Sequence, residues 1–170
     1  MKAEQFLKNI ISLDPQIRFA GVMEKSGHLY VSSWRDGAEE YLKGRNPEIS
    51  LSQSVYIVDL RKMFTLDLGN LKAVTYIYDK VKALSVPVKD HVLAVSIETA
   101  ANSEQLLDKI LNYVKSVETE LSLYPPGNIV NEEKKEVLRN LRDSGIADDL
   151  IAEQLDLDVN TVKVLIAEMK

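Results

Sequence analysis

Two adjacent prolines followed by a glycine, Pro125-Pro126-Gly127, set the strongest constraint on how this chain of 170 residues can fold. Each proline fixes its own φ and lacks a backbone N–H, so the long helical pattern before them must stop near Tyr124. No internal repeat or low-complexity tract divides the chain elsewhere. The sequence therefore predicts a domain over residues 1–124, a Pro-rich linker over 125–131 and a small unit over 132–170.

The first 124 residues predict an α+β fold with the element order α-β-β-α-β-β-β-α. Apolar residues recur at helical spacing in three segments, and runs rich in β-branched and aromatic residues predict five strands. Gly27 supplies the positive φ of the first hairpin, and Asn102 or Ser103 caps the last helix. A five-stranded antiparallel sheet with flanking helices is the natural packing. The expected helices are 3–13, 50–64 and 102–124, with a short one inside 35–48, and the expected strands are 17–25, 28–34, 72–79, 81–88 and 91–98.

The hairpin sequence "FAGVMEKSGHLYVSS" carries a resemblance to a known family. Together with the opening helix, the long middle helix and the run "YDKVKALSVPVKDHVLAVSIE", it resembles the roadblock/dynein light chain family, which has a profilin-like fold. The resemblance covers nearly all of residues 1–124, and it implies a non-catalytic dimer that binds small GTPases or scaffolds other proteins. The sensor-like PAS and GAF folds also place helices on an antiparallel sheet, so the element order by itself leaves them open.

The middle helix, 50–64, carries two apolar stripes on opposite sides. At about 100° per residue, Leu51, Val55 and Val58 cluster on one side, and polar residues separate them from a second stripe. A helix on the surface of a monomer needs only one such stripe, so two stripes predict burial on both sides. Two alternatives would bury the second stripe. Either a partner subunit covers it, which would make the chain a homodimer, or residues 39–48 or the tail cover it within the same chain. The candidate dimer-interface residues are Tyr56, Ile57, Leu60, Met63 and Phe64.

Residues 132–170 predict three short helices, which resemble the helix-turn-helix of bacterial and archaeal regulators. The first helix ends at Gly145, which suits a left-handed cap. Ala152 lies where a helix-turn-helix needs a small residue between its two helices. Asp156 stands at the turn position usually held by glycine, a departure that is tolerated because Asp adopts left-handed conformations better than most residues. Asp158 is the expected cap of the third helix.

The charge of this tail bears on whether it can bind DNA. Ten acidic and six basic residues give residues 132–170 a net charge of −4, whereas phosphate contacts require a basic surface. The tail is therefore either a DNA-binding unit that acts usefully as a dimer or a unit that docks a protein. The expected phosphate contacts are Lys134, Lys135, Arg139 and Arg142, and the expected base contacts are Asn160, Thr161 and Lys163.

Composition and motifs argue against several kinds of chemistry. The chain has no cysteine, which removes thiol catalysis and zinc–thiolate sites, and its net charge of −5 argues against a general polyanion binder. His28 and His91 both begin strands at hairpin turns, where solvated histidines are expected. No glycine-rich phosphate loop occurs, so we expect no enzyme activity, no cofactor and no metal. Nothing resembles a signal peptide or a membrane span, which predicts a cytoplasmic protein.

Two functional hypotheses fit these features. The first is a transcription-regulator-like protein, in which a roadblock-like dimerisation or sensing domain carries a DNA-binding helix-turn-helix. The alternative is an interaction scaffold or small-GTPase regulator whose tail docks a protein partner. A homodimer belongs to both hypotheses, and they differ in whether duplex DNA is a partner.

Overall fold

The computed structural model describes residues 1–123, 132–155, 157 and 159–168. The chain forms two compact units, Met1–Leu123 and Tyr124–Lys170. The predicted linker over 125–131, the predicted turn residue Asp156 and the predicted cap residue Asp158 lie outside the described residues.

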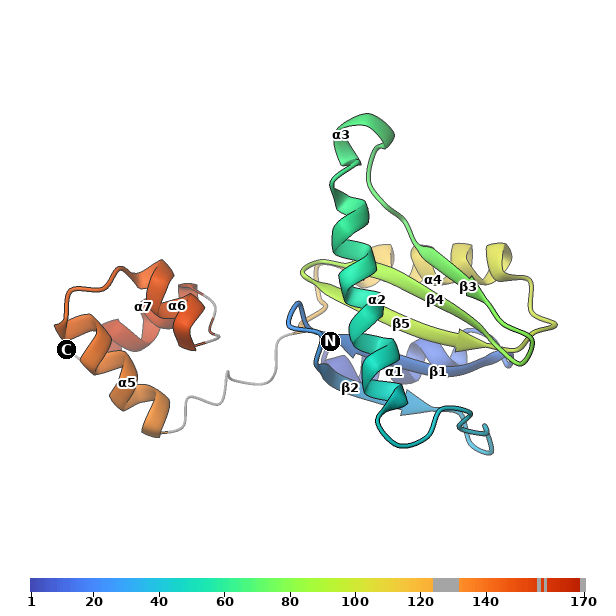
Figure 1. Cartoon of the computed structure of the whole chain (residues 1–170), viewed down its shortest axis with the longest axis horizontal. Helices are drawn as coiled ribbons and strands as arrows, with labels where there is room; N and C mark the ends of the chain where they lie inside the picture. Colours follow the sequence, from blue (N-terminus) through green and yellow to red (C-terminus); the bar gives the residue numbers. More distant parts are fainter. Residues whose placement is uncertain (124–131, 156, 158, 169–170) are drawn as a thin grey trace. The chain divides into compact units, whose positions relative to one another are not determined.

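The first unit confirms the predicted α+β class, with a five-stranded sheet and helices on both of its faces (Figure 1). All neighbouring strands are antiparallel, and their order is β2-β1-β5-β4-β3, so β1, β5 and β4 lie inside the sheet. The elements are α1 (Ala3–Ser12), β1 (Ile17–Met23), β2 (Leu29–Trp34), α2 (Asn46–Lys62), α3 (Thr65–Leu68), β3 (Val74–Ile77), β4 (Lys82–Val88), β5 (His91–Ile97) and α4 (Ser103–Val117).

Local backbone requirements fix the turns and the length of the edge strand. Gly27, between β1 and β2, has a φ of 85°, and a Cβ there would lie 2.6 Å from the Ser52 hydroxyl oxygen, so both conformation and space favour glycine. β3 pairs with β4 only from Lys82 to Ser85, and Pro87 follows two residues later. Proline has no N–H to donate and is tolerated where a strand edge is open, so β4 can continue to Val88, beyond its last pairing with Val74, the first residue of β3.

Two helices cover one face of the sheet, and a single long helix crosses the other (Figure 1). α1 and α4 lie on what we call the packed face, where the rings of Phe6 and Tyr113 stack with their centroids 5.9 Å apart. α2 lies on the opposite face, which we call the α2 face. There Val55 and Val58 pack with Met23 and other strand residues.

The strands present side chains of different size to these two faces. Successive residues of a strand point to opposite sides of the sheet. From β4 and β5, the packed face receives Leu84, Val86, Val88, Leu93, Val95 and Ile97. The α2 face receives mostly smaller residues from the same strands, namely Ala83, Ser85, Ala94 and Ser96. α2 therefore rests on a floor that is lower than the one beneath α1 and α4.

The second predicted helix has different limits in the structure. α2 begins at Asn46 rather than at 50, and Pro47 occupies its first turn, where a missing N–H costs nothing. The short helix predicted inside 35–48 does not form as a separate element, because residues 35–45 are non-helical. Gly37 and Gly44 both have a positive φ, of 77° and 64°, and each such residue interrupts helical geometry.

The last helix of the first unit is shorter than predicted. Its expected start is confirmed, since the side chain of Asn102 accepts a hydrogen bond from the backbone N–H of Gln105 at 3.1 Å. Its expected end near Tyr124 is wrong, because α4 stops at Val117. Leu121 is nevertheless buried, and Ser122 forms a parallel bridge with Lys2. Apolar spacing thus continues past the helix because the following segment also belongs to the core.

The second unit contains the three predicted helices, α5 (Glu132–Asp143), α6 (Asp148–Leu155) and α7 (Val159–Glu168). Leu138, Ile151, Leu155 and Val162 from all three helices form its small core. Gly145 has a φ of 76°, which confirms the left-handed end predicted for the first of these helices.

Candidate interaction surfaces

Exposed apolar side chains run along the outer side of α2, and we call this surface the α2 ridge. Its inner counterpart is buried, with Val55 4% and Val58 0% exposed. On the ridge itself, 66% of Tyr56, 49% of Leu60 and 71% of Met63 are exposed. The predicted interface residue Ile57 is half-buried at the side of the helix. The ridge consists of Ile49, Tyr56, Leu60, Met63 and Phe64.

Residues 39–48 do not cover the α2 ridge. Tyr41 from this segment lies with its ring 4.5 Å from the guanidinium carbon of Arg18, at the sheet, and Leu42 is itself 45% exposed. The sequence-based alternative in which this segment covers the second stripe is therefore wrong. Within the first unit, the ridge is an apolar surface that faces solvent.

Exposed apolar side chains also occur outside α2. Leu66 and Leu68 of α3, which follows α2 directly, are 99% and 82% exposed. Ile77 and Tyr78, at the end of the edge strand β3, are also largely exposed. Exposed apolar side chains that gather on one surface mark sites of protein interaction, and an open strand edge is a second such feature.

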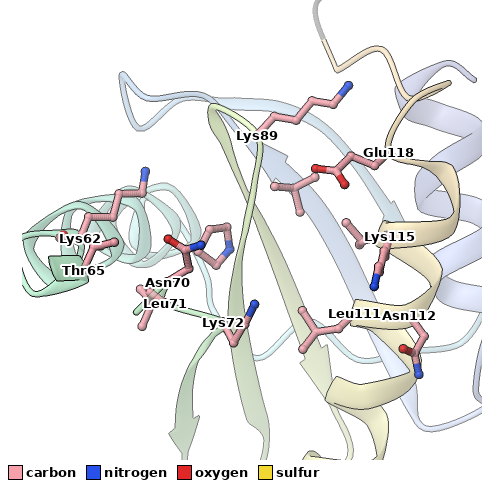
Figure 2. A pocket seen from close by; sticks show the side chains of 13 residues that line it. Lys62, Thr65, Asn70, Leu71, Lys72, Lys89, Leu111, Asn112, Lys115 and Glu118 are labelled. Carbon is pink, nitrogen blue, oxygen red and sulfur yellow. Dashed lines mark hydrogen bonds between the residues drawn. The ribbon is translucent and has the colours of Figure 1, made fainter. Parts of the chain in front are cut away.

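A groove rich in lysine lies beside the C-terminal end of α2, and we call it the lysine groove (Figure 2). It has a volume of about 770 Å³, with α4 on one side and residues 62–72 on the other. Lys62 pairs with Asp59 at 3.0 Å, and Lys89 donates to the carbonyl oxygen of Leu121 at 2.7 Å. The groove also contains Lys72, Lys115 and, as its acidic member, Glu118. Its surplus of positive charge suits acidic groups on a partner.

A buried arginine ties the sheet to the segment that precedes α2. Arg18 is 5% exposed and its Nη1 donates to both carboxylate oxygens of Glu98, at 3.0 Å each. Its Nη2 donates to the carbonyl oxygen of Glu39 at 2.7 Å, and Nη1 reaches the Tyr41 hydroxyl at 3.3 Å. Sequence reasoning missed this cluster, because its members are far apart along the chain and only the fold brings them together.

The histidines do not share the exposure that the sequence predicts. His28 is exposed, but His91 is 7% exposed, so its predicted solvation is wrong. His91 is the first residue of β5 and lies in step with Leu93 and Val95, which point to the packed face. Burial lowers the pKa of His91, because it disfavours the charged imidazolium.

Metal binding and membrane crossing also bear on function. Among residues 1–123, 132–155, 157 and 159–168, no group of three or more histidine, aspartate or glutamate side chains is arranged to hold a metal ion. Within the same part of the chain, none of the helices has both the length and the apolar character needed to cross a membrane.

The residues predicted to contact DNA lie on the first and third helices of the second unit. On α5, Arg139 is exposed, whereas Lys135 and Arg142 are half-buried; their spacing of four and three residues places them on one side of the helix. On α7, Lys163 is exposed and Thr161 is half-buried. The side chains of Lys134 and Asn160 lie outside those that the structure describes.

Comparisons with known proteins agree with the architecture. No protein-family profile matches the chain, and no curated protein matches its sequence. Among solved structures, a roadblock/LC7 domain from Streptomyces avermitilis is similar with a TM-score of 0.55 and 14% identity, covering 71% of this chain and 98% of that one. The gliding protein MglB from Thermus thermophilus gives a TM-score of 0.56 and 9% identity, over 69% of this chain and 86% of its own. MglC from Myxococcus xanthus gives 0.50 and 18%, over 69% and 98%. The chain therefore contains the roadblock/LC7 fold.

Proposed function

We propose that this chain is a non-enzymatic interaction protein that forms a homodimer through the α2 ridge and binds a small GTPase. The observation that carries the proposal is the exposure of the ridge on a helix whose other side is already buried. The roadblock/LC7 fold supports the partner class, because the family resemblance implies dimers that bind small GTPases or scaffold other proteins. The expectation of a DNA-binding regulator becomes the second candidate.

The geometry of the ridge suits pairing with a second copy of itself. Tyr56, Leu60 and Met63 follow one another at spacings of four and three residues, so they form one line along α2. Two such lines can meet around a two-fold axis, where the same patch serves both subunits. Complete burial of a large apolar side chain contributes about 1.5–3 kcal/mol, so the ridge of both subunits would supply a substantial part of the association energy.

Leu60→Glu tests the dimer against Arg61→Glu as its matched control. Both changes place a glutamate at adjacent exposed positions of α2, but Arg61 lies on the polar side of the helix. We expect light scattering at tens of micromolar to show a dimer for the wild type and Arg61→Glu, and a monomer or an aggregate for Leu60→Glu. A monomeric wild type, or a Leu60→Glu variant that remains dimeric, would refute the proposed interface.

The GTPase assignment needs a separate measurement. The full-length chain, immobilised, should capture purified small GTPases from the same genome in one nucleotide state, either with GDP or with a non-hydrolysable GTP analogue. Binding without nucleotide preference would argue for a general scaffold, and no binding would remove the partner class while leaving the dimer in place. Lys72→Glu and Lys115→Glu, in the lysine groove, would then tell whether its charge contributes.

DNA binding by the second unit is favoured by one observation. Ala152 is 3% exposed, and its carbonyl oxygen accepts a hydrogen bond from the N–H of Leu157 at 2.8 Å, where a helix-turn-helix needs a small residue. If Lys163 reaches a guanine, Lys163→Ala should weaken specific binding by about 1–3 kcal/mol, and affinity should fall steeply with salt. Absence of salt-sensitive binding of the full-length chain to duplex DNA at low ionic strength would leave protein docking as the role of this unit.

A further inference from the structure

A hollow on the α2 face lies between the sheet and the first turns of α2. Its volume is about 370 Å³, within the range of roughly 300–1,000 Å³ found for small-molecule sites. Strand residues line one side, and Pro47, Leu51 and residues 39–42 line the other. Protein interiors are packed about as densely as organic crystals, so an open space of this size next to a core needs a physical reason.

The floor of the hollow is low because its side chains are small. Gly21 also belongs to the α2 face, and a Cβ there would lie 2.8 Å from Cζ of Phe19. The Phe19 ring therefore occupies the space above Gly21 and forms part of the lining. The small residues that line the floor are Ser32, Ala83, Ser85, Ala94 and Ser96.

Large apolar side chains surround this hollow without being buried. Leu29 is 41% exposed, Trp34 40%, Tyr41 38% and Leu42 45%, and all four line it. Trp34 also contacts Phe19, with ring centroids 4.7 Å apart and a tilt of 54°. A concave site bordered by exposed aromatic and aliphatic groups fits a small molecule, whereas the α2 ridge lies on the outer side of a helix and fits a protein surface.

The charges around the hollow select against anions. Arg18 reaches the lining, but its guanidinium is already compensated by the two oxygens of Glu98. Glu39 and Glu40 add two further carboxylates to the lining. Lys80, whose Nζ lies 5.9 Å from the centroid of the Tyr41 ring, offsets one of them. A negatively charged ligand would therefore still meet a surplus of negative charge, whereas a neutral ligand would not be repelled.

We propose that this hollow binds a small, neutral, ring-containing molecule that carries one hydrogen-bonding group. Its ring would lie against Phe19 and Trp34, in the offset or edge-to-face arrangements that aromatic groups favour. Its polar group would reach a serine hydroxyl of the floor, such as Ser32 or Ser96. Arg18 holds the wall at residues 39–42 in place through the Glu39 carbonyl and the Tyr41 hydroxyl, so little ordering entropy is lost on binding.

The chain has one tryptophan, Trp34, and this residue reports on the site directly. The probe is 4-ethylphenol, which is uncharged at pH 7, and the comparison compound is 4-hydroxyphenylacetate, which has the same ring and a carboxylate. With the full-length protein, we expect a saturable change of Trp34 emission with 4-ethylphenol. The anion should bind at least about tenfold more weakly, which corresponds to roughly 1.4 kcal/mol.

Two variants fill the hollow from its floor, Ser96→Leu and Ala83→Leu, and Arg61→Glu on the polar side of α2 serves as control. Both filled variants should lose the response to 4-ethylphenol without lowering the urea midpoint of unfolding, and Arg61→Glu should keep it. The proposal is overturned if the wild type gives no saturable response, if the anion binds as tightly as the neutral probe, or if folded filled variants bind normally. Loss of binding in Arg61→Glu would show that the response does not come from the hollow and would overturn it as well.

Discussion

The two faces of the sheet are made by the same strands, yet they differ in what covers them. On the packed face, α1 and α4 bury large side chains completely, among them Phe6, Leu7 and Ile110. On the α2 face, one helix rests on a low floor and leaves Leu29 and Trp34 partly exposed. The packed face mainly stabilises the fold. The α2 face combines a smaller core with the hollow between α2 and the sheet and with the exposed α2 ridge.

This division follows from alternation along the strands. In β4, the residues Ala83, Leu84, Ser85 and Val86 alternate between small and large, and β5 repeats the pattern. Because complete burial of a large apolar side chain contributes about 1.5–3 kcal/mol, the face that receives the large residues supplies most of the folding free energy. The other face can therefore carry a hollow and an exposed ridge without losing the fold.

The largest contrast in the free energy of unfolding is expected from truncating one leucine on the packed face and one on the α2 ridge. Leu93 is completely buried on the packed face, and Leu93→Ala should lower the free energy of unfolding by about 2–5 kcal/mol. Leu60→Ala on the α2 ridge should change it by less than about 0.5 kcal/mol at concentrations where the chain is monomeric. Urea unfolding followed by Trp34 emission measures the first unit alone, because the second unit has no tryptophan. Equal losses in the two variants would contradict this division of roles.

The sequence was sufficient to predict the fold class because local signals and pattern agree there. Gly27 at the first hairpin and Asn102 at the start of α4 are both found as predicted. The end of α4 was not predictable, since Leu121 and Leu123 extend the apolar spacing although they pack in a non-helical segment. The spacing of apolar residues indicates which positions are buried, and buried positions continue beyond the end of α4.

The candidate site was predictable only in part. The α2 ridge is visible as the second stripe of one helix, but the hollow depends on which strand residues face α2, and that depends on sheet order. The alternation of small and large residues in β4 and β5 is a signal that could have indicated two unlike faces. His91 shows the same limit, because its register with Leu93 indicates burial only once the packed face is known.

Adding side-chain volume should also distinguish the two faces of the sheet. Ala20 is completely buried on the packed face, so Ala20→Leu should overpack the core and lower the free energy of unfolding by about 1–3 kcal/mol. Ser96→Leu adds a side chain of the same type beside the hollow, where space exists, and should cause no loss. The same fluorescence-monitored urea titration compares them. A destabilised Ser96→Leu variant would mean that the α2 face is as tightly packed as the other.

The ion pair on the α2 face should have a moderate effect. Glu98→Gln removes the carboxylate that pairs with Arg18. The side chain of Arg18 is 6% exposed, whereas that of Glu98 is 46% exposed. Water can partly replace the lost carboxylate, so we expect a loss of about 1 kcal/mol. The loop at residues 39–42 should also loosen, which faster tryptic cleavage at Lys43 or Arg45 would reveal. Glu40→Gln is the matched control, and equal cleavage of both variants would show that the pair does not hold the loop.

The smallest effect is expected from the ion pair on the packed face, between Lys109 of α4 and Asp14 in the turn after α1, at 2.7 Å. The hydrogen bond from Lys109, assisted by the N–H of Gln16, holds the pKa of Asp14 below its ordinary value of 3.8. Asp14 therefore stabilises the fold above that value, and its contribution is lost as the pH falls through the lower folded-state pKa. Asp14→Asn can still accept the Gln16 N–H, so it isolates the charge; since Lys109 is 44% exposed, the loss at pH 7 should be only about 0.2–1 kcal/mol. The difference from wild type should shrink as the pH drops below about 4, while Asp36→Asn should show none at either pH. A difference that persists unchanged in acid would mean that Asp14 acts through its shape rather than its charge.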